Sequence, residues 1–176
     1  MLFSIVISIV ILQRLIELFV ARRNEKWMLD QGAFEAGAAH YPIMVAMHVT
    51  FFVSMLLEVM VLGRTLSPIW MVLLGIFLLT QAARVWCLAS LGKFWNTKII
   101  ILPGADVVRR GPYRWIRHPN YLIVSIELLV LPLLFGAYLT AVLYSLLNVW
   151  MLTVRIPAEE KALKDATNYR ETFSLE

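Results

Sequence analysis

The sequence has 176 residues, of which 60% are hydrophobic, with a mean hydropathy of +0.74 and a net charge of +4. Several apolar runs approach the roughly 20 residues that a helix needs to cross a bilayer, and the length leaves no room for a soluble domain beside them. The basic residues lie at the ends of these runs and not on a polar face, which argues against nucleic-acid binding. We predict an all-α integral membrane protein with a single domain, residues 1–176.

The first predicted span covers residues 2–21, and it lacks the basic start and the cleavage site of a secretory signal peptide. A polar connection over residues 22–40 follows, with glycines that break regular structure. The next two spans are expected at 41–62 and 69–91, separated by a short turn that contains glycine, serine and proline.

A long polar and aromatic connection is expected over residues 92–120. Its prolines, Pro103, Pro112 and Pro119, prevent a continuous helix. A connection of this length in a compact domain indicates a functional role. The end of this connection, residues 111–121, places arginines, a histidine and tyrosines directly before a long apolar segment.

The apolar stretch 121–153 is longer than one untilted helix requires. Pro132 and Gly136 near its middle predict a helical hairpin, with spans at 121–135 and 137–153. About five transmembrane helices follow in total.

The charged tail, residues 155–176, is expected to form a surface helix that begins at Pro157 and has Tyr169 and Phe173 on its apolar side. With five spans, thirteen basic residues lie on one side of the membrane, whereas Arg64 alone lies on the other. The thirteen are Arg22, Arg23, Lys26, Lys93, Lys98, Arg109, Arg110, Arg114, Arg117, Arg155, Lys161, Lys164 and Arg170. The positive-inside rule therefore places the connection and the tail together in the cytoplasm.

Several charged side chains fall within the predicted spans, where a charge at the bilayer centre costs about 2.5 to 3.5 kcal/mol on insertion scales. We expect Arg14 to pair with Glu17, and Arg84 to pair with Glu58 or Glu127. Any that remain without a partner would line a substrate cavity. Candidates for the substrate side are Arg14, Glu17, His48, Arg84 and Trp95. Neither His40 nor His48 has acidic or cysteine partners at ligand spacing, so no metal is expected.

Two motifs, Gly111-Pro112-Tyr113 with Arg117-His118-Pro119-Asn120-Tyr121, and Arg155 followed by Glu159-Glu160-x-x-Leu163, resemble the paired signature of the isoprenylcysteine carboxyl methyltransferase family. Further elements resemble a short, five-span branch of that family: Arg14-Leu15-x-Glu17-Leu18, Arg22-Arg23-Asn24, Gly32-Ala33-x-Glu35-x-Gly37, His40-Tyr41-Pro42 and His48. The resemblance covers nearly the whole chain.

The resemblance implies methyl transfer from S-adenosylmethionine, bound in a cytoplasmic pocket, to a lipophilic acceptor that arrives from the bilayer. The matching cofactor-binding positions are Tyr113, Arg117, His118, Pro119, Tyr121, Leu122 and Glu159. Arg155 and Glu160 match catalytic positions. Arg155 would clamp an acceptor carboxylate, whereas a phenol or enol would also benefit from a base, for which Glu160 or His118 is the candidate. The acceptor would be a prenylcysteine-like carboxylate or another lipid acid, phenol or pyrone oxygen.

Two alternatives belong to other classes. Sterol reductases contain a similar Arg-His-Pro-Asn-Tyr string, which would make the protein an NADPH-dependent membrane reductase. The charges within spans would also suit a non-catalytic membrane scaffold or transporter. In each case membrane lipids are the expected surroundings, with no nucleic-acid partner.

Overall fold

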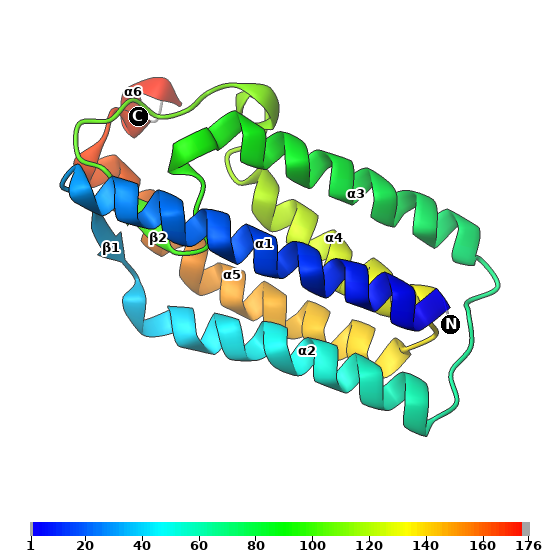
Figure 1. Cartoon of the computed structure of the whole chain (residues 1–176). Coiled ribbons are helices and arrows are strands. Elements are labelled where there is room, and N and C mark those ends of the chain that lie inside the picture. The colour runs from blue at the N-terminus through cyan, green and yellow to red at the C-terminus, as the bar shows by residue number, and fades with distance from the viewer. Residues whose placement is uncertain (1, 174–176) are drawn as a thin grey trace. The chain divides into compact units, whose positions relative to one another are not determined.

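The structure, a computed structural model, describes residues 2–173, and these divide into two compact, mainly helical units (Figure 1). The first unit comprises Met1–Ala38, Leu91–Val108 and Ala158–Glu176, and the second comprises Ala39–Ser90 and Arg109–Pro157. Residues 1 and 174–176, at the ends of the expected domain and tail, lie outside the described part.

The first unit contains the long helix α1 and a two-stranded antiparallel sheet. Its elements are α1 (Leu2–Asp30), β1 (Phe34–Ala36), η2 (Gly92–Phe94), β2 (Ile99–Ile101), the end of α5 (Tyr138–Ala166) and α6 (Tyr169–Thr172). In the sheet Glu35 pairs with Ile100. The sequence did not predict these strands, because three residues are too few to show an alternating pattern.

Helix α1 is nine residues longer than the predicted span, which ended at Ala21. The next residues include no glycine or proline, so nothing stops the helix before Gly32, whose φ is 90°. The expectation of a polar connection from residue 22 onward was therefore wrong. The added turns hold Asn24, whose side-chain Nδ2 donates to the carbonyls of Gly92 at 3.1 Å and Trp95 at 2.7 Å.

An ionic contact joins the end of α1 to the sheet of the first unit. The Lys98 ammonium donates to carboxylate oxygens of Glu25 at 2.8 Å and Glu35 at 3.1 Å. These hydrogen bonds raise the pKa of Lys98. The first residues of the connection that starts at residue 92 are thus fixed against α1 at two points, through Asn24 and through Lys98.

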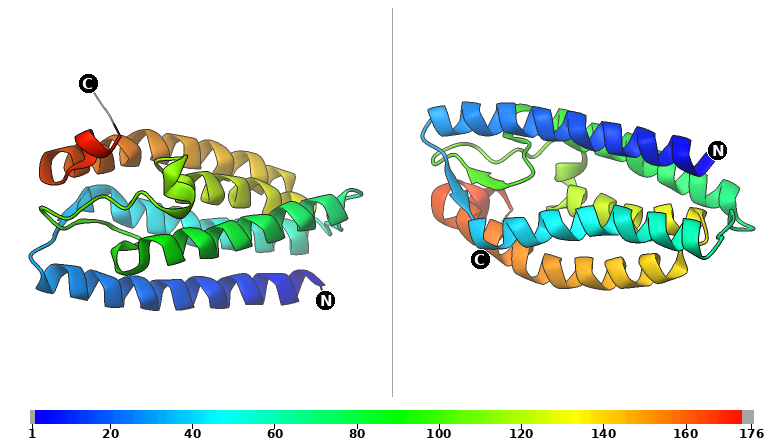
Figure 2. Two further views of the ribbon diagram at one scale, coloured as in Figure 1. Left: turned by 90° about the horizontal axis from the view of Figure 1, so that it is seen from above. Right: turned by 60° about the horizontal axis from the view of Figure 1, so that its bottom comes forward.

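The second unit is a helical bundle. It contains η1 (Ala38–His40), α2 (Tyr41–Val61), α3 (Trp70–Leu91), η3 (Gly111–Arg114), α4 (Pro119–Leu134) and the larger part of α5. Helices α2, α3, α4 and this part of α5 run lengthwise beside one another (Figures 1 and 2). Helices α4 and α5 are separated at Gly136, where the sequence predicts a break, and φ there is 68°. A side chain at this position would lie 2.9 Å from the Thr65 carbonyl, so only glycine fits.

Polar side chains from α2 hold the first turns of α5. The Glu58 carboxylate accepts hydrogen bonds from the backbone amides of Leu139 at 3.1 Å and Thr140 at 2.8 Å, and from the Thr140 hydroxyl at 2.8 Å. It also lies 3.4 Å from Arg64. A carboxylate at a helix N-terminus satisfies amides that lack partners within the helix and interacts favourably with the helix dipole.

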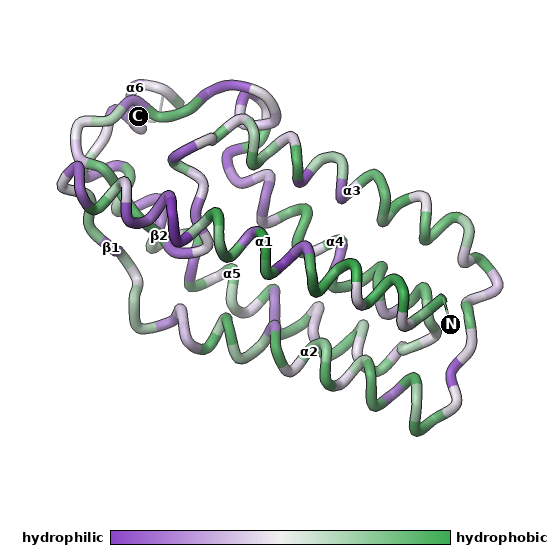
Figure 3. The backbone as a smooth tube through the Cα atoms, viewed as in Figure 1, coloured by the Kyte–Doolittle hydropathy of each residue, from purple (hydrophilic) through white to green (hydrophobic). Residues whose placement is uncertain are grey.

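Four described helices are long and apolar enough to cross a membrane: α1, the segment Ala38–Val61 that contains α2, the segment Trp70–Phe94 that contains α3, and α5. Figure 3 shows their apolar stretches, with polar residues gathered in the connections and in the last turns of α1. Helix α4 has 16 residues, which corresponds to about 24 Å, shorter than the hydrocarbon core of about 30 Å. The described part of the chain therefore has the composition of an all-α membrane protein, and five crossings remain a prediction.

Helix α5 also differs from the prediction at its C-terminal end. We expected a separate surface helix to begin at Pro157, but Pro157 lies inside α5, which continues to Ala166. Proline removes one backbone hydrogen bond and crowds the carbonyl of Thr153, yet it does not end the helix here. The region 155–173 contains instead the end of α5 and the short α6, in which Tyr169 packs against Phe173 with ring centroids 4.8 Å apart.

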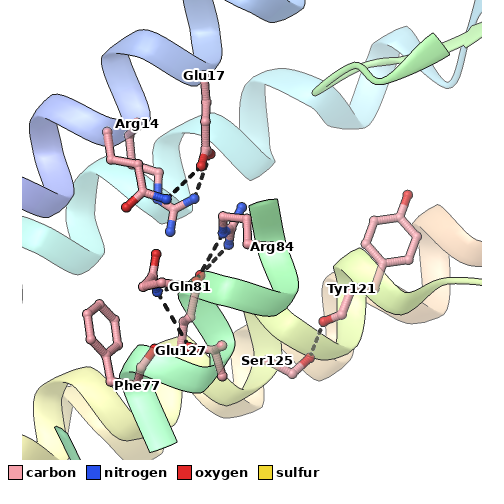
Figure 4. Close-up of polar contacts among 10 residues, drawn as sticks. Arg14, Glu17, Phe77, Gln81, Arg84, Tyr121, Ser125 and Glu127 are labelled. Atoms are coloured by element: carbon pink, nitrogen blue, oxygen red, sulfur yellow. Dashed lines mark hydrogen bonds and ion pairs between the residues drawn. The ribbon is translucent and has the colours of Figure 1, made fainter. Parts of the chain in front are cut away.

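Two pairs of oppositely charged residues lie in the apolar helices, as Figure 4 shows. On α3, the guanidinium of the buried Arg84 donates to both carboxylate oxygens of Glu127 on α4, and the Gln81 amide donates to the same carboxylate at 2.7 Å. On α1, Arg14 donates to Glu17 at 2.6 Å. Of the two partners that the sequence allowed for Arg84, the structure selects Glu127.

The pair of Arg84 and Glu127 generates a stability prediction. Glu127→Leu leaves a buried guanidinium without its carboxylate and is expected to destabilise the protein by about 3 to 5 kcal/mol. The double variant Arg84→Met with Glu127→Leu removes both charges and is expected to recover most of that loss. Unfolding in mixed micelles, followed by circular dichroism, is measured for four proteins: the parent, Glu127→Leu, Arg84→Met and the double variant. If the double variant loses as much stability as the two single variants added together, the two side chains are not coupled.

Candidate active site

The motif at residues 117–121 forms the start of α4. Pro119 occupies the first turn of the helix, where its missing N–H costs nothing, and it disfavours helical geometry at the preceding residue. His118 accordingly has φ −125° and ψ 62°. Its ring lies against the Tyr121 ring, with centroids 5.4 Å apart and an interplanar angle of 24°. The motif therefore builds a stacked pair of rings at the N-terminal end of α4.

Arg155 of α5 lies against the same tyrosine. Its Nε donates to the Tyr121 hydroxyl at 3.4 Å, and its guanidinium carbon lies 5.9 Å from the ring centroid. Only 4% of Arg155 is exposed, so its charge is strongly desolvated. The structure thus brings together one residue from each of the two sequence motifs, with Tyr121 between Arg155 and His118.

Polar contacts one turn further along α4 hold the backbone of Tyr121 in place. The Ser125 hydroxyl donates to the Tyr121 carbonyl at 2.8 Å, and it accepts from the Asn148 amide of α5 at 2.8 Å (Figure 4 shows the first contact). Asn148 is 3% exposed. Neither residue was predicted from the sequence, although an amide in the apolar run 137–153 was a detectable signal, since polar groups within membrane helices usually need partners.

The loop before α4 is anchored to the end of α3. Gly111 has φ 58°, and a side chain there would lie 2.0 Å from the Ser90 hydroxyl, so the position requires glycine. The neighbouring Arg110 donates from Nε to the Ser90 carbonyl at 3.0 Å. Of the remaining candidates for the cofactor in this unit, Tyr113 and Pro119 are buried, whereas Arg117 and Leu122 are exposed.

The candidate carboxylates of the tail belong to the first unit. Glu160 accepts from the Lys164 ammonium at 3.0 Å and from the Tyr169 hydroxyl at 3.4 Å. This segment is tied to the loop after β2, because Asn168 accepts from the Val107 amide at 2.9 Å and the Gly104 amide donates to the Ala166 carbonyl at 2.8 Å. Glu159 is partly exposed.

The candidates for the substrate side have separate surroundings. His48 is held by its own helix, with Nδ1 2.8 Å from the Met44 carbonyl. Trp95 is 3% exposed, and its indole N–H has no hydrogen-bond partner among the described residues. Arg84 is bound to Glu127, and Arg14 to Glu17, so their charges are already compensated within their own units.

His40 lies at the N-terminal end of α2, in the same unit as Arg155. Both of its ring nitrogens are buried, and neither has a hydrogen-bond partner among the described residues. The charge of Arg155 acts on this imidazole. The sequence drew attention to His40 as part of the His40-Tyr41-Pro42 element, but it did not connect this residue to Arg155.

The second unit can therefore hold an anionic or polarised oxygen at Arg155 and can stack an aromatic ligand near Tyr121 and His118. These are groups suited to positioning and charge stabilisation.

Comparison with known proteins gives the family. Residues 71–165 match the isoprenylcysteine carboxyl methyltransferase (ICMT) family, a segment that contains both sequence motifs. The chain is 45% identical over 163 residues to a protein of Bacillus subtilis (strain 168) named "Uncharacterized protein YpbQ", which covers 93% of this chain and 97% of the relative. A protein of Haemophilus influenzae (strain ATCC 51907 / DSM 11121 / KW20 / Rd), named "Uncharacterized protein", is 28% identical over 161 residues, covering 91% of this chain and 94% of the relative.

No solved structure matches the chain significantly. The family match covers more than half of the sequence, includes His118, Tyr121 and Arg155, and agrees with the resemblance of the two motifs. The chain belongs to the isoprenylcysteine carboxyl methyltransferase family of membrane methyltransferases.

Proposed function

We propose that this protein transfers a methyl group from S-adenosylmethionine to an oxygen of a lipophilic acceptor that enters from the bilayer. The observation that carries the proposal is the contact of the buried Arg155 with Tyr121, which in turn stacks on His118. All three residues lie in the segment that matches the methyltransferase family.

For the cofactor, we propose that residues 117–122 contact S-adenosylmethionine. The cofactor presents a carboxylate, for which His118 and Arg117 are suitable donors, and an adenine ring, which suits the Tyr113 and Tyr121 rings with Pro119 and Leu122 as apolar neighbours. Glu159 would accept hydrogen bonds from the ribose hydroxyls. The residue types at these positions thus match the carboxylate, the adenine and the ribose of the cofactor.

For the acceptor, we propose that Arg155 holds the reacting oxygen. Methyl transfer from a sulfonium is an in-line displacement, so catalysis consists mainly of aligning oxygen, methyl carbon and sulfur, and of excluding water. A guanidinium that is 4% exposed binds an acceptor oxygen more strongly than one in water does. The acceptor would be a prenylcysteine-like carboxylate, or another lipid acid, phenol or pyrone oxygen.

We further propose five membrane crossings, with α4 and α5 as a hairpin and the residues of 92–120 on the cytoplasmic side. The distribution of lysine and arginine supports this orientation.

The first functional prediction concerns the cofactor. His118→Ala and Tyr121→Phe are expected to raise the Kd for S-adenosylmethionine about tenfold to a hundredfold, because the first removes a ring proposed to contact the cofactor and the second removes the hydroxyl that holds the Tyr121 ring against Arg155. Titration calorimetry on the purified protein measures the Kd. Tyr138→Phe is the matched control, because Tyr138 is the first residue of α5 and Arg155 lies 17 residues further along that helix. This variant should leave the Kd unaltered.

The same titration separates the proposal from the reductase alternative. Binding of NADPH with no binding of S-adenosylmethionine by the parent protein would reject the proposed function. Unaltered cofactor affinity in both variants would remove residues 117–122 from the site.

The second functional prediction separates the two catalytic candidates. Arg155→Lys keeps the charge but loses the planar donor pair, and it is expected to lower kcat about 10²- to 10³-fold with cofactor binding retained. Glu160→Gln is expected to raise the KM for S-adenosylmethionine, with Glu171→Gln as a matched control. Transfer of a tritiated methyl group measures both. Parental kinetics in Arg155→Lys and Glu160→Gln would show that neither residue serves the reaction.

The third functional prediction concerns topology. In a Cys87→Ala background, a cysteine at position 65 should react with an impermeant maleimide added outside intact cells, whereas one at position 106 should react only after lysis. Cys87 is the one cysteine of the sequence, so the background has none. The reverse pattern of labelling would invert the proposed orientation.

A further inference from the structure

His40 is a polar group that the fold leaves without a hydrogen bond. Its Nδ1 and Nε2 are both buried, and neither has a partner in the described chain. Buried polar atoms without partners are uncommon in proteins and often mark a place where a ligand or a water binds. A neutral imidazole offers one nitrogen that accepts a proton and one that donates a hydrogen bond.

The packing of α2 against α5 places His40 within about one helical turn of the level of Arg155. Two contacts fix the register: Glu58 with Thr140, and the Ser54 hydroxyl with the Tyr144 hydroxyl at 2.9 Å. From the first contact to the second, the residue number falls by four on α2, from 58 to 54, and rises by four on α5, from 140 to 144. The two helices are therefore antiparallel. Figure 1 and the right panel of Figure 2 show α2 and α5 side by side.

The same register can be extended from Tyr144 to Arg155. Eleven residues along α5 are close to three turns, so Arg155 lies on the same face as Tyr144 and level with Ile43 of α2. His40 lies three residues before Ile43, about 4.5 Å further along the axis. The electrostatic influence of Arg155 on His40 agrees with this placement.

The geometry points to His40 as the base that removes a proton from an acceptor hydroxyl held by Arg155. This inference rests on the proposed function and deepens it, because a base is needed for a phenol or enol and not for a carboxylate, which is already ionised. The acceptor class that His40 fits is therefore a lipophilic molecule with a weakly acidic hydroxyl. The sequence had suggested Glu160 or His118 for this role.

In the reaction, a ring nitrogen of His40 takes the hydroxyl proton while the oxygen forms a bond to the methyl carbon of S-adenosylmethionine. The carbon–sulfur bond breaks and its electron pair stays on sulfur, which gives S-adenosylhomocysteine. Arg155 stabilises the negative charge on the oxygen. The imidazolium then releases its proton to water.

The test compares two acceptors of similar shape, a long-chain alkylphenol and the same phenol made more acidic by a nitro group. In His40→Gln, kcat/KM for the alkylphenol is expected to fall about 10²- to 10⁴-fold, the usual contribution of a general base. For the nitrophenol, which is largely ionised without help, the loss should be less than about tenfold. The Kd for S-adenosylmethionine should not change. Thr50→Ala on the same helix is the control, since the Thr50 hydroxyl bonds to the carbonyls of Ala46 and Met47, and the ratio of kcat/KM for the two acceptors in this variant should equal the parental ratio.

Equal losses of kcat/KM on both acceptors in His40→Gln, or a weakened Kd for the cofactor, would overturn the inference while leaving the proposed function in place. Absence of methyl transfer by the parent protein to either phenol, with transfer to a lipid carboxylate, would also overturn the inference alone. If the parent protein does not bind S-adenosylmethionine, the proposed function fails and the inference fails with it.

If His40→Gln does not fold, a measurement on the parent protein tests whether a protein-bound base removes the proton of the phenol. Across a series of substituted phenols, a protein-bound base makes kcat/KM depend weakly on the acidity of the phenol. A tenfold fall in kcat/KM for each unit of phenol pKa, as expected when only the ionised phenol reacts, would overturn the assignment of His40.

Discussion

The carboxylate of Glu58 is the contact on which the geometry of the second unit depends. It binds the backbone amides of Leu139 and Thr140 in the first turn of α5 and thereby sets the position of that helix against α2. Three polar residues further along α5 contact neighbouring helices: Tyr144 meets Ser54 of α2, and Asn148 and Arg155 meet Ser125 and Tyr121 of α4. Apolar side chains alone would leave such helices free to slide, since lipid competes equally for their surfaces. The polar contacts therefore supply the specificity of the packing.

The candidate site uses the end of this arrangement opposite to Gly136. At that end a proline-started helix presents His118 and Tyr121, and a buried arginine from α5 contacts the tyrosine. The site thus combines residues about 34 positions apart in the sequence. Holding them on rigid helices, with Ser125 and Asn148 supporting the tyrosine from the next turn, gives the fixed geometry that methyl transfer requires.

The sequence predicted those features that local chemistry determines. The helix break at Gly136 follows from a position that only glycine can occupy, and the pairing of Arg84 with a glutamate follows from the cost of an isolated charge among apolar residues. The two motifs also singled out Arg155 and Tyr121, which the structure places in contact, although the sequence did not predict them as direct neighbours.

Other features depended on packing and could not be read from the sequence. A proline in a helix interior usually kinks or ends the helix, yet α5 continues through Pro157. No local sequence pattern distinguishes these two outcomes. The strands β1 and β2 are too short to show periodicity. The proximity of His40 to Arg155 depends on the register of α2 against α5, which only the three-dimensional contacts of Glu58 and Ser54 reveal.

The pairing of Arg84 with Glu127 also constrains how the protein is made. Arg84 leaves the ribosome 43 residues ahead of its partner. Until α4 follows, the arginine of α3 is unpaired, and at the centre of a bilayer that state costs about 2.5 to 3.5 kcal/mol. During synthesis α3 thus gains its full stability in lipid only when α4 arrives. If α3 and α4 both cross the membrane, as proposed, they enter it as a coupled pair, and insertion of α4 and the pairing of Glu127 with Arg84 are then one event.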